Sequence, residues 1–257
     1  MIQSASRNCR TWDATGYNER FGYVSRFGAG AVELAAVRAG EVVLDLGCGT
    51  GTLMQQFHVN GAVVSGIDGD PEMVRTAREL LPELDIRVAD GQSFTVPAPV
   101  DVVFSNAALH WMTRPSEVAR CVVAALRPGG RFVAEMGGAG NVATIIEAVS
   151  AEGDARGVAV TSPWYFPTIA EHSAVLEAAG LRVCFMEHFS RPTPLAGPDG
   201  VTGWLRMFGD RLLDSFPSEE RADVIAAAAD RTRAFLHTPQ GWIADYWRLR
   251  FVAEKPG

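Results

Sequence analysis

Between residues 41 and 136, short apolar runs alternate with stretches whose apolar residues recur at helical spacing. The short runs are rich in β-branched and aromatic residues and are bounded by Gly, Pro or Asp, which predicts strands. Continuous apolar strands separated by helices indicate a parallel sheet covered on both faces. The predicted strands are 41–46, 62–67, 86–89, 100–105 and 131–136, and the predicted helices between them include 71–81 and 115–126.

After residue 136 the regular alternation of short apolar runs and helical patterns ends. A helical face is predicted over 141–151, and a capping box (Thr168 and Glu171) starts another helix that ends before Gly180. A strand over 181–189 follows. Two further helices are predicted from apolar stripes, and the alternation over 246–252 predicts a last strand near a sheet edge. The stripes are Val201, Trp204, Leu205, Phe208 and Leu212, then Val224, Ile225, Ala228 and Phe235 after a cap at Ser218.

These patterns predict three parts. Residues 1–40 form an N-terminal helical lid, which carries Tyr17 and precedes the first strand. Residues 41–194 and 242–257 form the α/β core. Residues 195–241 form a helical insert before the last strand.

Composition and charge reduce the number of function classes that fit this chain. Of 257 residues, 47% are hydrophobic and 21% charged, which allows a substantial core. The net charge of −7 argues against a broad surface that follows nucleic-acid phosphates. The four cysteines are too scattered for a disulfide framework, and no metal-ligand spacing occurs. Without a signal peptide or a membrane-spanning stretch, we expect a cytoplasmic protein that binds neither nucleic acid nor membrane.

The segment with the most chemical information is VVLDLGCGTG, residues 42–51. Here a strand runs into glycines and then a helix, so the backbone can approach a ligand closely at the carboxyl edge of the sheet. Dinucleotide sites use such turns too, but their third glycine falls at position 52, which is Thr52 here. Asp45 would repel a pyrophosphate and attract an ammonium or sulfonium group.

Two more carboxylates end the next two predicted strands. Asp68 is placed to accept hydrogen bonds from ribose hydroxyls, and Asp90 is placed near an adenine amino group. Three carboxylates on adjacent strand ends fit a ligand that is cationic at one end and a nucleoside at the other. S-adenosylmethionine has this form.

At these residues the chain resembles the Rossmann-fold S-adenosylmethionine-dependent methyltransferases. The resemblance covers 41–138 and rests on five segments. They are DLGCGTG (45–51), GIDGDPEMV (66–74), AD (89–90), DVVFSNAALHWM (101–112) and LRPGGRFVAEM (126–136). Within the family, the chain is most similar to the trans-aconitate methyltransferase group. The resemblance implies a doubly wound, mostly parallel seven-stranded sheet with an antiparallel last strand.

The resemblance also implies roles for individual residues. Asp45 would face the amino group of the cofactor, and Asp68 with Gly69 would hold its ribose. Met73 would pack on the adenine, which Asp90 and the Gly91 backbone would read. Asn106 would lie near the sulfonium, and Gly47, Gly49 and Gly51 would line the methionine moiety. The product would be S-adenosylhomocysteine.

The sequence says less about the methyl acceptor than about the cofactor. We expect a small molecule, with His110, Trp111 and Tyr17 as the candidate catalytic or substrate-contacting residues. A carboxylic acid needs no general base, whereas a phenol would benefit from His110. O-methylation of a small carboxylic acid therefore stands beside C-, N- or phenol O-methylation, a non-catalytic cofactor-binding module and a nicotinamide dehydrogenase. The roles of Trp164 and Trp204, and the oligomeric state, stay open.

Overall fold

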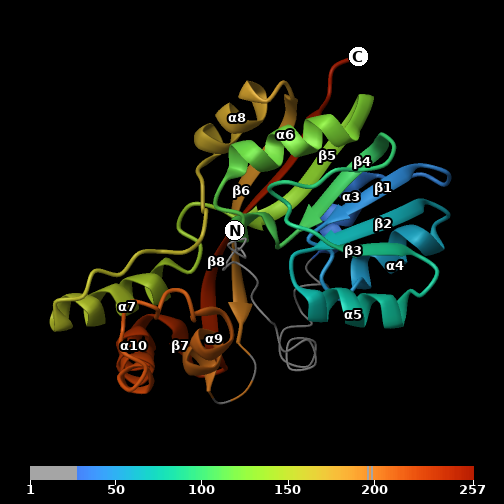
Figure 1. The fold of residues 1–257 in the computed structure, drawn as a ribbon. Helices are drawn as coiled ribbons and strands as arrows, with labels where there is room; N and C mark the ends of the chain where they lie inside the picture. Colours follow the sequence, from blue (N-terminus) through green and yellow to red (C-terminus); the bar gives the residue numbers. More distant parts are fainter. Residues whose placement is uncertain (1–27, 196, 198) are drawn as a thin grey trace, which may run out of the picture. The chain divides into compact units, whose positions relative to one another are not determined.

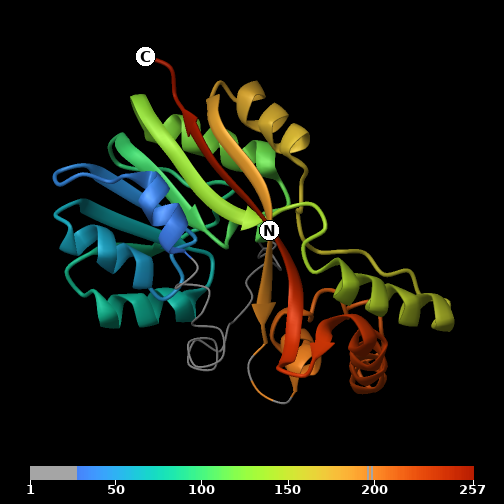
Figure 2. The same cartoon turned by 180° about the vertical axis from the view of Figure 1, so that it is seen from behind.

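The computed structural model describes residues 28–257, except 196 and 198. The predicted α/β fold is confirmed: the strands run in the order β3-β2-β1-β4-β5-β8-β6, and a short β7 pairs with β8 outside this path (Figures 1 and 2). The strands are β1 (Val42–Leu46), β2 (Val63–Asp68), β3 (Asp85–Val88), β4 (Val100–Asn106), β5 (Leu126–Gly137), β6 (Arg182–Pro194), β7 (His237–Thr238) and β8 (Gly241–Glu254).

Helices connect most of these strands. They are α3 (Ala29–Ala35), α4 (Thr52–Val59), α5 (Pro71–Leu80), the 3-10 helix η1 (Leu109–Trp111), α6 (Pro115–Ala125), α7 (Ala143–Arg156), α8 (Ile169–Ala178), α9 (Gly200–Phe208) and α10 (Arg221–Leu236). Of the predicted lid over 1–40, residues 1–27 lie outside the described part of the chain. The described part divides into two compact units, and each is described by itself below.

The first unit comprises residues up to Met136 together with 169–187 and 250–257, and it contains the parallel strands. β1 pairs in parallel with β2 and β4, β2 with β3, and β4 with β5. β8 runs in the opposite direction to β5 (Figure 2). Because parallel strands share their direction, the carboxyl ends of β1, β2, β3, β4 and β5 lie along one edge of the sheet.

One face of this sheet packs on α3, α4 and α5. Their shared core includes Ala35, Phe57 and Ala77 from the helices, and Val43, Phe104 and Val133 from neighbouring strands. Phe57 and Phe104 meet edge to face, with ring centroids 5.0 Å apart. Helices α6 and α8 lie on the opposite face (Figure 1). The layers thus follow the expectation for continuous apolar strands.

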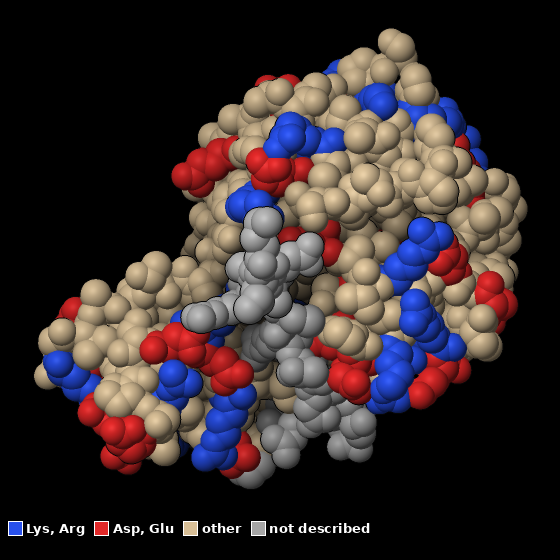
Figure 3. All heavy atoms as spheres, in the orientation of Figure 1, with Lys and Arg blue, Asp and Glu red and all other residues tan. Residues whose placement is uncertain are grey.

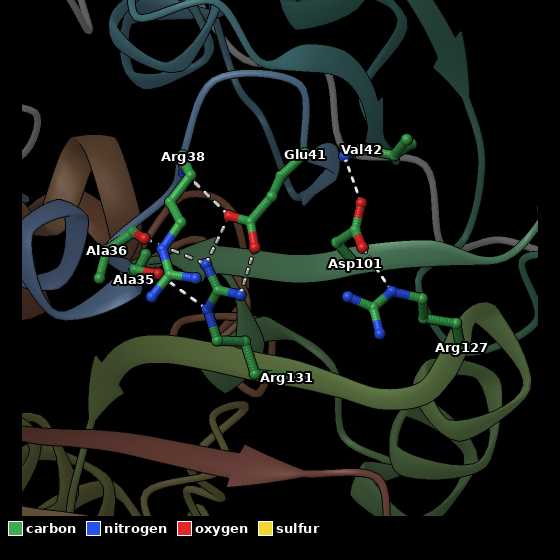
Figure 4. Close-up of polar contacts among 8 residues, drawn as sticks. All are labelled: Ala35, Ala36, Arg38, Glu41, Val42, Asp101, Arg127 and Arg131. Atoms are coloured by element: carbon green, nitrogen blue, oxygen red, sulfur yellow. Dashed lines mark hydrogen bonds and ion pairs between the residues drawn. The ribbon is translucent and has the colours of Figure 1, made fainter. Parts of the chain in front are cut away.

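An ionic cluster ties α3 to the amino end of the sheet (Figure 4). The guanidinium of Arg131 donates to both carboxylate oxygens of Glu41, at 2.9 and 2.8 Å, and to the Ala35 and Ala36 carbonyls at the end of α3. This pairing lowers the pKa of Glu41 to about 2. Beside it, Asp101 accepts from the Val42 N–H at 2.7 Å and pairs with Arg127.

The second unit comprises 137–168 and 188–249, so it includes the predicted insert over 195–241 and also α7. Helices α7 and α10 pack on each other, and the buried Glu152 of α7 pairs with Arg231 of α10 and with Arg156. Trp164 and Trp204 are both buried, with ring centroids 5.8 Å apart. Trp204 donates its indole N–H to the Tyr246 hydroxyl at 2.7 Å. Aromatic packing and a charged brace thus hold this unit.

Several local predictions differ from the structure, among them those for Leu126, Ser218 and Phe235. Leu126 belongs to β5, not to the preceding helix, because it pairs with Val100 beyond a register shift. Glu220 rather than Ser218 is the N-cap residue of helix α10, and its side chain makes no capping hydrogen bond, while the Ser218 hydroxyl donates to Glu219. Phe235 is 78% exposed, although Val224 and Ala228 of the same predicted stripe are buried. Regular helical spacing predicted a wider buried face than this helix has.

Candidate functional site

The turn between β1 and α4 is held against β2. Gly47, Gly49 and Gly51 all have left-handed backbone angles, with φ of 77°, 54° and 83°. The N–H groups of Gly47 and Cys48 both donate to the Ile67 carbonyl, at 2.8 and 3.0 Å. Glycine adopts such angles at little cost, so the sequence determines the path of this turn.

The three glycines differ in what surrounds them. A Cβ atom on Gly47 would overlap the side chain of Ala108, and one on Gly51 would lie 3.3 Å from Ala77 Cβ. A Cβ atom on Gly49 would meet no atom of the described chain within 4 Å. Gly47 and Gly51 therefore allow close packing, whereas Gly49 borders open space that a ligand can enter.

Asp45 is a buried carboxylate in β1, with 2% of its surface exposed. Burial, helped by the negative charge of Asp68, raises its pKa to about 8. A cation bound beside it would favour the ionised carboxylate and recover this electrostatic cost. The position is therefore suited to a positively charged group.

Asp68, the last residue of β2, connects the glycine turn to the start of α5. Its Oδ2 accepts from the Gly49 N–H and its Oδ1 from the Asp70 N–H, both at 2.9 Å. Burial raises the pKa of Asp68, while these N–H groups oppose the rise. Each carboxylate oxygen has a second lone pair, so hydroxyl groups of a ligand can still donate to it.

The loop after β3 places Asp90 at the surface. Its Oδ1 accepts from the Gln92 backbone N–H at 2.9 Å, and its Oδ2 lies 3.6 Å from the guanidinium of Arg114. The next residue, Gly91, is buried, and a Cβ atom there would lie 2.7 Å from the Met112 side chain. Asp90 thus stabilises its own turn and lies beside the positive charge of Arg114.

The two remaining predicted cofactor residues, one after β2 and one on α5, differ in exposure. Met73 lies in the core on α5, and Gly69 is exposed between Asp68 and Asp70.

The end of β4 carries a buried polar atom. The Oδ1 of Asn106 has no hydrogen-bond partner in the described part of the chain. His110 and Trp111 follow in η1, His110 buried and Trp111 half-buried, with ring centroids 5.6 Å apart. Tyr17, the third candidate, lies outside the described residues.

Asp45 and Asn106 lie on the same face of the sheet. Side chains alternate along a strand, so Asp45 shares its face with Val43, and Asn106 shares its face with Phe104. Val43 and Phe104 both pack in the core beneath α3 and α4. β1 and β4 are neighbours with Asp45 opposite Phe104. The structure therefore brings Asp45, Asp68 and Asn106 to adjacent strand ends, whereas Trp164 and Trp204 belong to the second unit.

Sequence reasoning missed two residues at this edge. Glu135 of β5 is fully buried, and its Oε2 accepts from Nε and Nη2 of Arg250 in β8, at 2.9 and 2.7 Å. The available signal was a glutamate inside the apolar run over 131–136. Its partner is 115 residues away along the chain, so no local pattern identifies the pair.

Together these features fit a cationic nucleoside ligand. They comprise a buried carboxylate, a second carboxylate that can accept from hydroxyls, the open space at Gly49 and the orphaned oxygen of Asn106. Within residues 28–257 no cluster of His, Cys, Asp and Glu side chains is suited to a metal ion. The same residues form no helix that is both long and apolar enough to cross a membrane.

Comparison with known proteins agrees with this site. Residues 44–134 match the family model described as a methyltransferase domain. An uncharacterized methyltransferase of Schizosaccharomyces pombe is 34% identical over 95% of this chain and 98% of its own length. A trans-aconitate 2-methyltransferase of Sinorhizobium medicae is 30% identical, over 74% of this chain and 76% of its own.

A solved structure shares the fold. The phosphoethanolamine N-methyltransferase 2 of Haemonchus contortus, in complex with S-adenosylhomocysteine, superimposes with a TM-score of 0.60. It is 15% identical in sequence, and the match covers 95% of this chain and 57% of that one. The resemblance found in the motifs is thus confirmed over most of the chain, and with it S-adenosylmethionine as the cofactor. This chain belongs to the Rossmann-fold S-adenosylmethionine-dependent methyltransferases.

Proposed function

We propose that this methyltransferase acts on a small carboxylic acid and forms a methyl ester. The observation that carries the proposal is the 30% identity to a trans-aconitate 2-methyltransferase over three quarters of each chain. The chemistry is consistent with it. A carboxylate is already a nucleophile at neutral pH, so the protein needs to orient it and exclude water rather than remove a proton.

The roles of the cofactor residues are part of this proposal. S-adenosylmethionine supplies a methyl group on a sulfonium, which is a good leaving group. Asp45 binds the amino group, and the turn with Gly47, Gly49 and Gly51 lies along the methionine portion. Asp68 and Gly69 hold the ribose. Met73, Asp90 and Gly91 contact the adenine, and Asn106 presents its Oδ1 to the sulfonium.

On the acceptor side, Trp111 provides a half-buried aromatic surface that binds the acid. Tyr17, which lies outside the described residues, stays a candidate for acceptor binding from the sequence. His110 is buried beside Trp111 and has a structural role if the acceptor is a carboxylate. We also propose a cytoplasmic location and no nucleic-acid substrate. In support, basic and acidic side chains are intermixed among the described residues on the face shown in Figure 3, rather than forming one positive field.

The test is a labelling experiment with S-adenosylmethionine that carries an isotopic methyl group. Trans-aconitate and a panel of small di- and tricarboxylic acids serve as acceptors, and the labelled product is identified by mass spectrometry. We expect an alkali-labile ester. His110→Ala should retain most of the wild-type kcat, while Trp111→Ala should raise KM. A wild-type enzyme that binds S-adenosylhomocysteine but labels no acid would overturn the proposal.

The burial of His110 next to Trp111 favours a second candidate, methylation of a phenol, nitrogen or carbon with His110 as the base. In that case kcat/KM should depend on pH, and His110→Ala should abolish this dependence together with most of the activity. A pH-independent rate between pH 6 and 8 would exclude this candidate.

A further inference from the structure

Gln92, in the loop after β3, has a buried side chain next to the proposed cofactor site. It is 8% exposed, whereas most glutamine side chains in folded proteins face solvent. Its loop begins beside the proposed ribose site, because the Ala89 N–H donates to the Asp68 carbonyl at 2.9 Å. Apart from its chain neighbours, a Cβ atom on Gly69 would come no closer than 4.0 Å to the described chain, at the Ala89 carbonyl oxygen. The space between these two loops is therefore open to a ligand.

Both ends of the Gln92 amide make hydrogen bonds. Nε2 donates to Oδ1 of Asp90 at 3.1 Å, and the backbone N–H of Gln92 donates to the same oxygen at 2.9 Å. Oε1 accepts from the backbone N–H of Arg114 at 2.9 Å and from its Nε at 3.4 Å. Arg114 is the N-cap residue of α6, so this side chain connects the loop after β3 to the start of that helix.

These hydrogen bonds fix the rotation of the Asp90 carboxylate. The backbone N–H alone forms an Asx turn, which most residues at position 92 would allow. The side-chain amide of Gln92 adds a second donor to the same oxygen, so turning the carboxylate would break two hydrogen bonds instead of one. The other oxygen, Oδ2, lies 3.6 Å from the guanidinium of Arg114, which is longer than a hydrogen bond. The Asp90 side chain is 48% exposed, so Oδ2 can accept from a ligand.

We propose that Gln92 is a positioning residue for the cofactor: it holds Oδ1 of Asp90 so that Oδ2 accepts a hydrogen bond from the 6-amino group of the adenine. This inference rests on the proposed role of Asp90 and is independent of the methyl acceptor. A carboxylate oxygen accepts from an amino group in a charge-assisted hydrogen bond, whose strength depends on geometry. Gln92 thereby contributes to the preference for adenine over a purine that lacks the amino group.

The test measures a ratio of two affinities. Calorimetry gives the Kd of S-adenosylhomocysteine and the Kd of its analogue with hydrogen in place of the 6-amino group. A defect that loosens the whole site weakens both ligands alike, whereas a displaced Asp90 carboxylate weakens only the ligand with the amino group. Because one hydrogen bond to a charged acceptor is lost, the wild-type protein should bind the analogue about 10- to 100-fold more weakly.

Two variants of Gln92 separate its hydrogen bonds. Gln92→Leu removes all of those made by the side chain and should reduce the ratio at least about threefold. Gln92→Glu keeps an oxygen for the Arg114 N–H, but its second oxygen cannot donate to Asp90 and repels the carboxylate, so the ratio should fall as well. Asp90→Ala should bind both ligands about equally, and adding Gln92→Leu to it should change the ratio no further.

The chain offers a matched control on the same strand. Nε of Arg78 donates to the Ile86 carbonyl at 2.8 Å and so connects α5 to β3. Arg78 is not among the proposed cofactor residues. Arg78→Met removes a comparable connection and should leave the ratio at its wild-type value, with urea unfolding used to compare the stability of all variants.

A wild-type ratio in Gln92→Leu, measured alongside an Asp90→Ala variant that has lost the preference, would overturn the inference and leave the role of Asp90 intact. If Gln92→Leu does not fold, Gln92→Glu decides by the same comparison. An equal fall of the ratio in Arg78→Met would also overturn the inference. If the wild-type protein binds both ligands equally well, the proposed role of Asp90 fails, and the role of Gln92 fails with it.

Discussion

In and around the β1–α4 turn, some residues are needed for packing of the fold and others are suited to bind a ligand. Gly47 and Gly49 share a left-handed backbone, but only Gly47 has a side chain, that of Ala108, in the space where its own Cβ would be. Asp45 and Asp68 are costly to bury, and in the described part of the chain the backbone N–H groups of Gly49 and Asp70 compensate Asp68 by donating to its carboxylate. Residues that cost stability in this way are candidates for binding.

Alanine substitutions should separate the two glycine roles. Gly47→Ala combines a left-handed backbone with steric overlap, so we expect the free energy of unfolding to fall by about 2–4 kcal/mol. Gly49→Ala should cost about 1 kcal/mol of stability, from the backbone alone, yet weaken S-adenosylhomocysteine binding at least tenfold. Urea unfolding and calorimetry measure the two effects. Wild-type affinity in Gly49→Ala would contradict the placement of the cofactor against this turn.

The raised pKa of Asp45 predicts a pH dependence. In the free protein the carboxyl group is mostly protonated below pH 8, so it must lose a proton when an ammonium group binds beside it. The affinity for S-adenosylhomocysteine should therefore rise from pH 6 to pH 8, by up to about tenfold per unit. Calorimetry in buffers of different ionisation enthalpy measures the released proton. Asp45→Asn should bind more weakly and without this slope; an equal slope in the variant would exclude Asp45 as its source.

At the scale of elements, the strands are fixed by their apolar residues and the helix ends by particular contacts. The ionic cluster around Arg131 shows this for α3. Its guanidinium donates hydrogen bonds both to carbonyls at the end of α3 and to Glu41, the residue before β1 (Figure 4). Elsewhere the side chain of Asp70 caps α5 by accepting from the Glu72 and Met73 N–H groups.

The ion pair of Glu41 and Arg131 in this ionic cluster should contribute stability that depends on pH. The pKa of Glu41 is lowered to about 2, below its ordinary value of 4.5, so its contribution is present above about pH 4.5 and is lost as the pH falls toward 2. Glu41→Gln should lower the free energy of unfolding at pH 7 by about 1–2 kcal/mol, discounted for partial exposure to solvent. Urea unfolding at several pH values should show the difference from wild type vanish near pH 2. A constant difference would show that the charge is not its origin.

At the scale of the molecule, the proposed cofactor residues all belong to the first unit. The second unit has its own aromatic core around Trp164 and Trp204 and its own charged brace at Glu152. The binding of S-adenosylhomocysteine should therefore stabilise the first unit directly.

S-adenosylhomocysteine at 100 times its Kd should raise the free energy of unfolding by about 2.7 kcal/mol. Hydrogen exchange should show the strongest protection in 45–51 and 66–70, which form the glycine turn and the Asp68 loop. Asp68→Asn keeps the shape of the side chain but loses the charge that the Gly49 and Asp70 N–H groups bind, so both effects should shrink. Unchanged stabilisation in this variant would contradict the role of Asp68.

The strands of the first unit and the sheet edge that carries the site were predictable from sequence. The apolar runs predicted the bounds of β1, β2 and β4 to within one residue. A strand that is buried on both faces appears in the sequence as a short, continuous apolar run, so its ends coincide with the ends of the run. Helix boundaries were less predictable: Leu126 joined a strand and Ser218 did not cap α10, since both depend on contacts with other parts of the chain.

By itself, the sequence determined the doubly wound fold, the glycine turn and the positions of Asp45 and Asp68 on neighbouring strands, because all of these depend on local patterns and on the direction of parallel strands. Only the tertiary structure decided that Asp45 is fully buried, that Gly49 rather than Gly47 borders open space and that Glu135 meets Arg250. Burial and pairing depend on residues that are distant in the chain, and the sequence pattern around one residue carries no information about them.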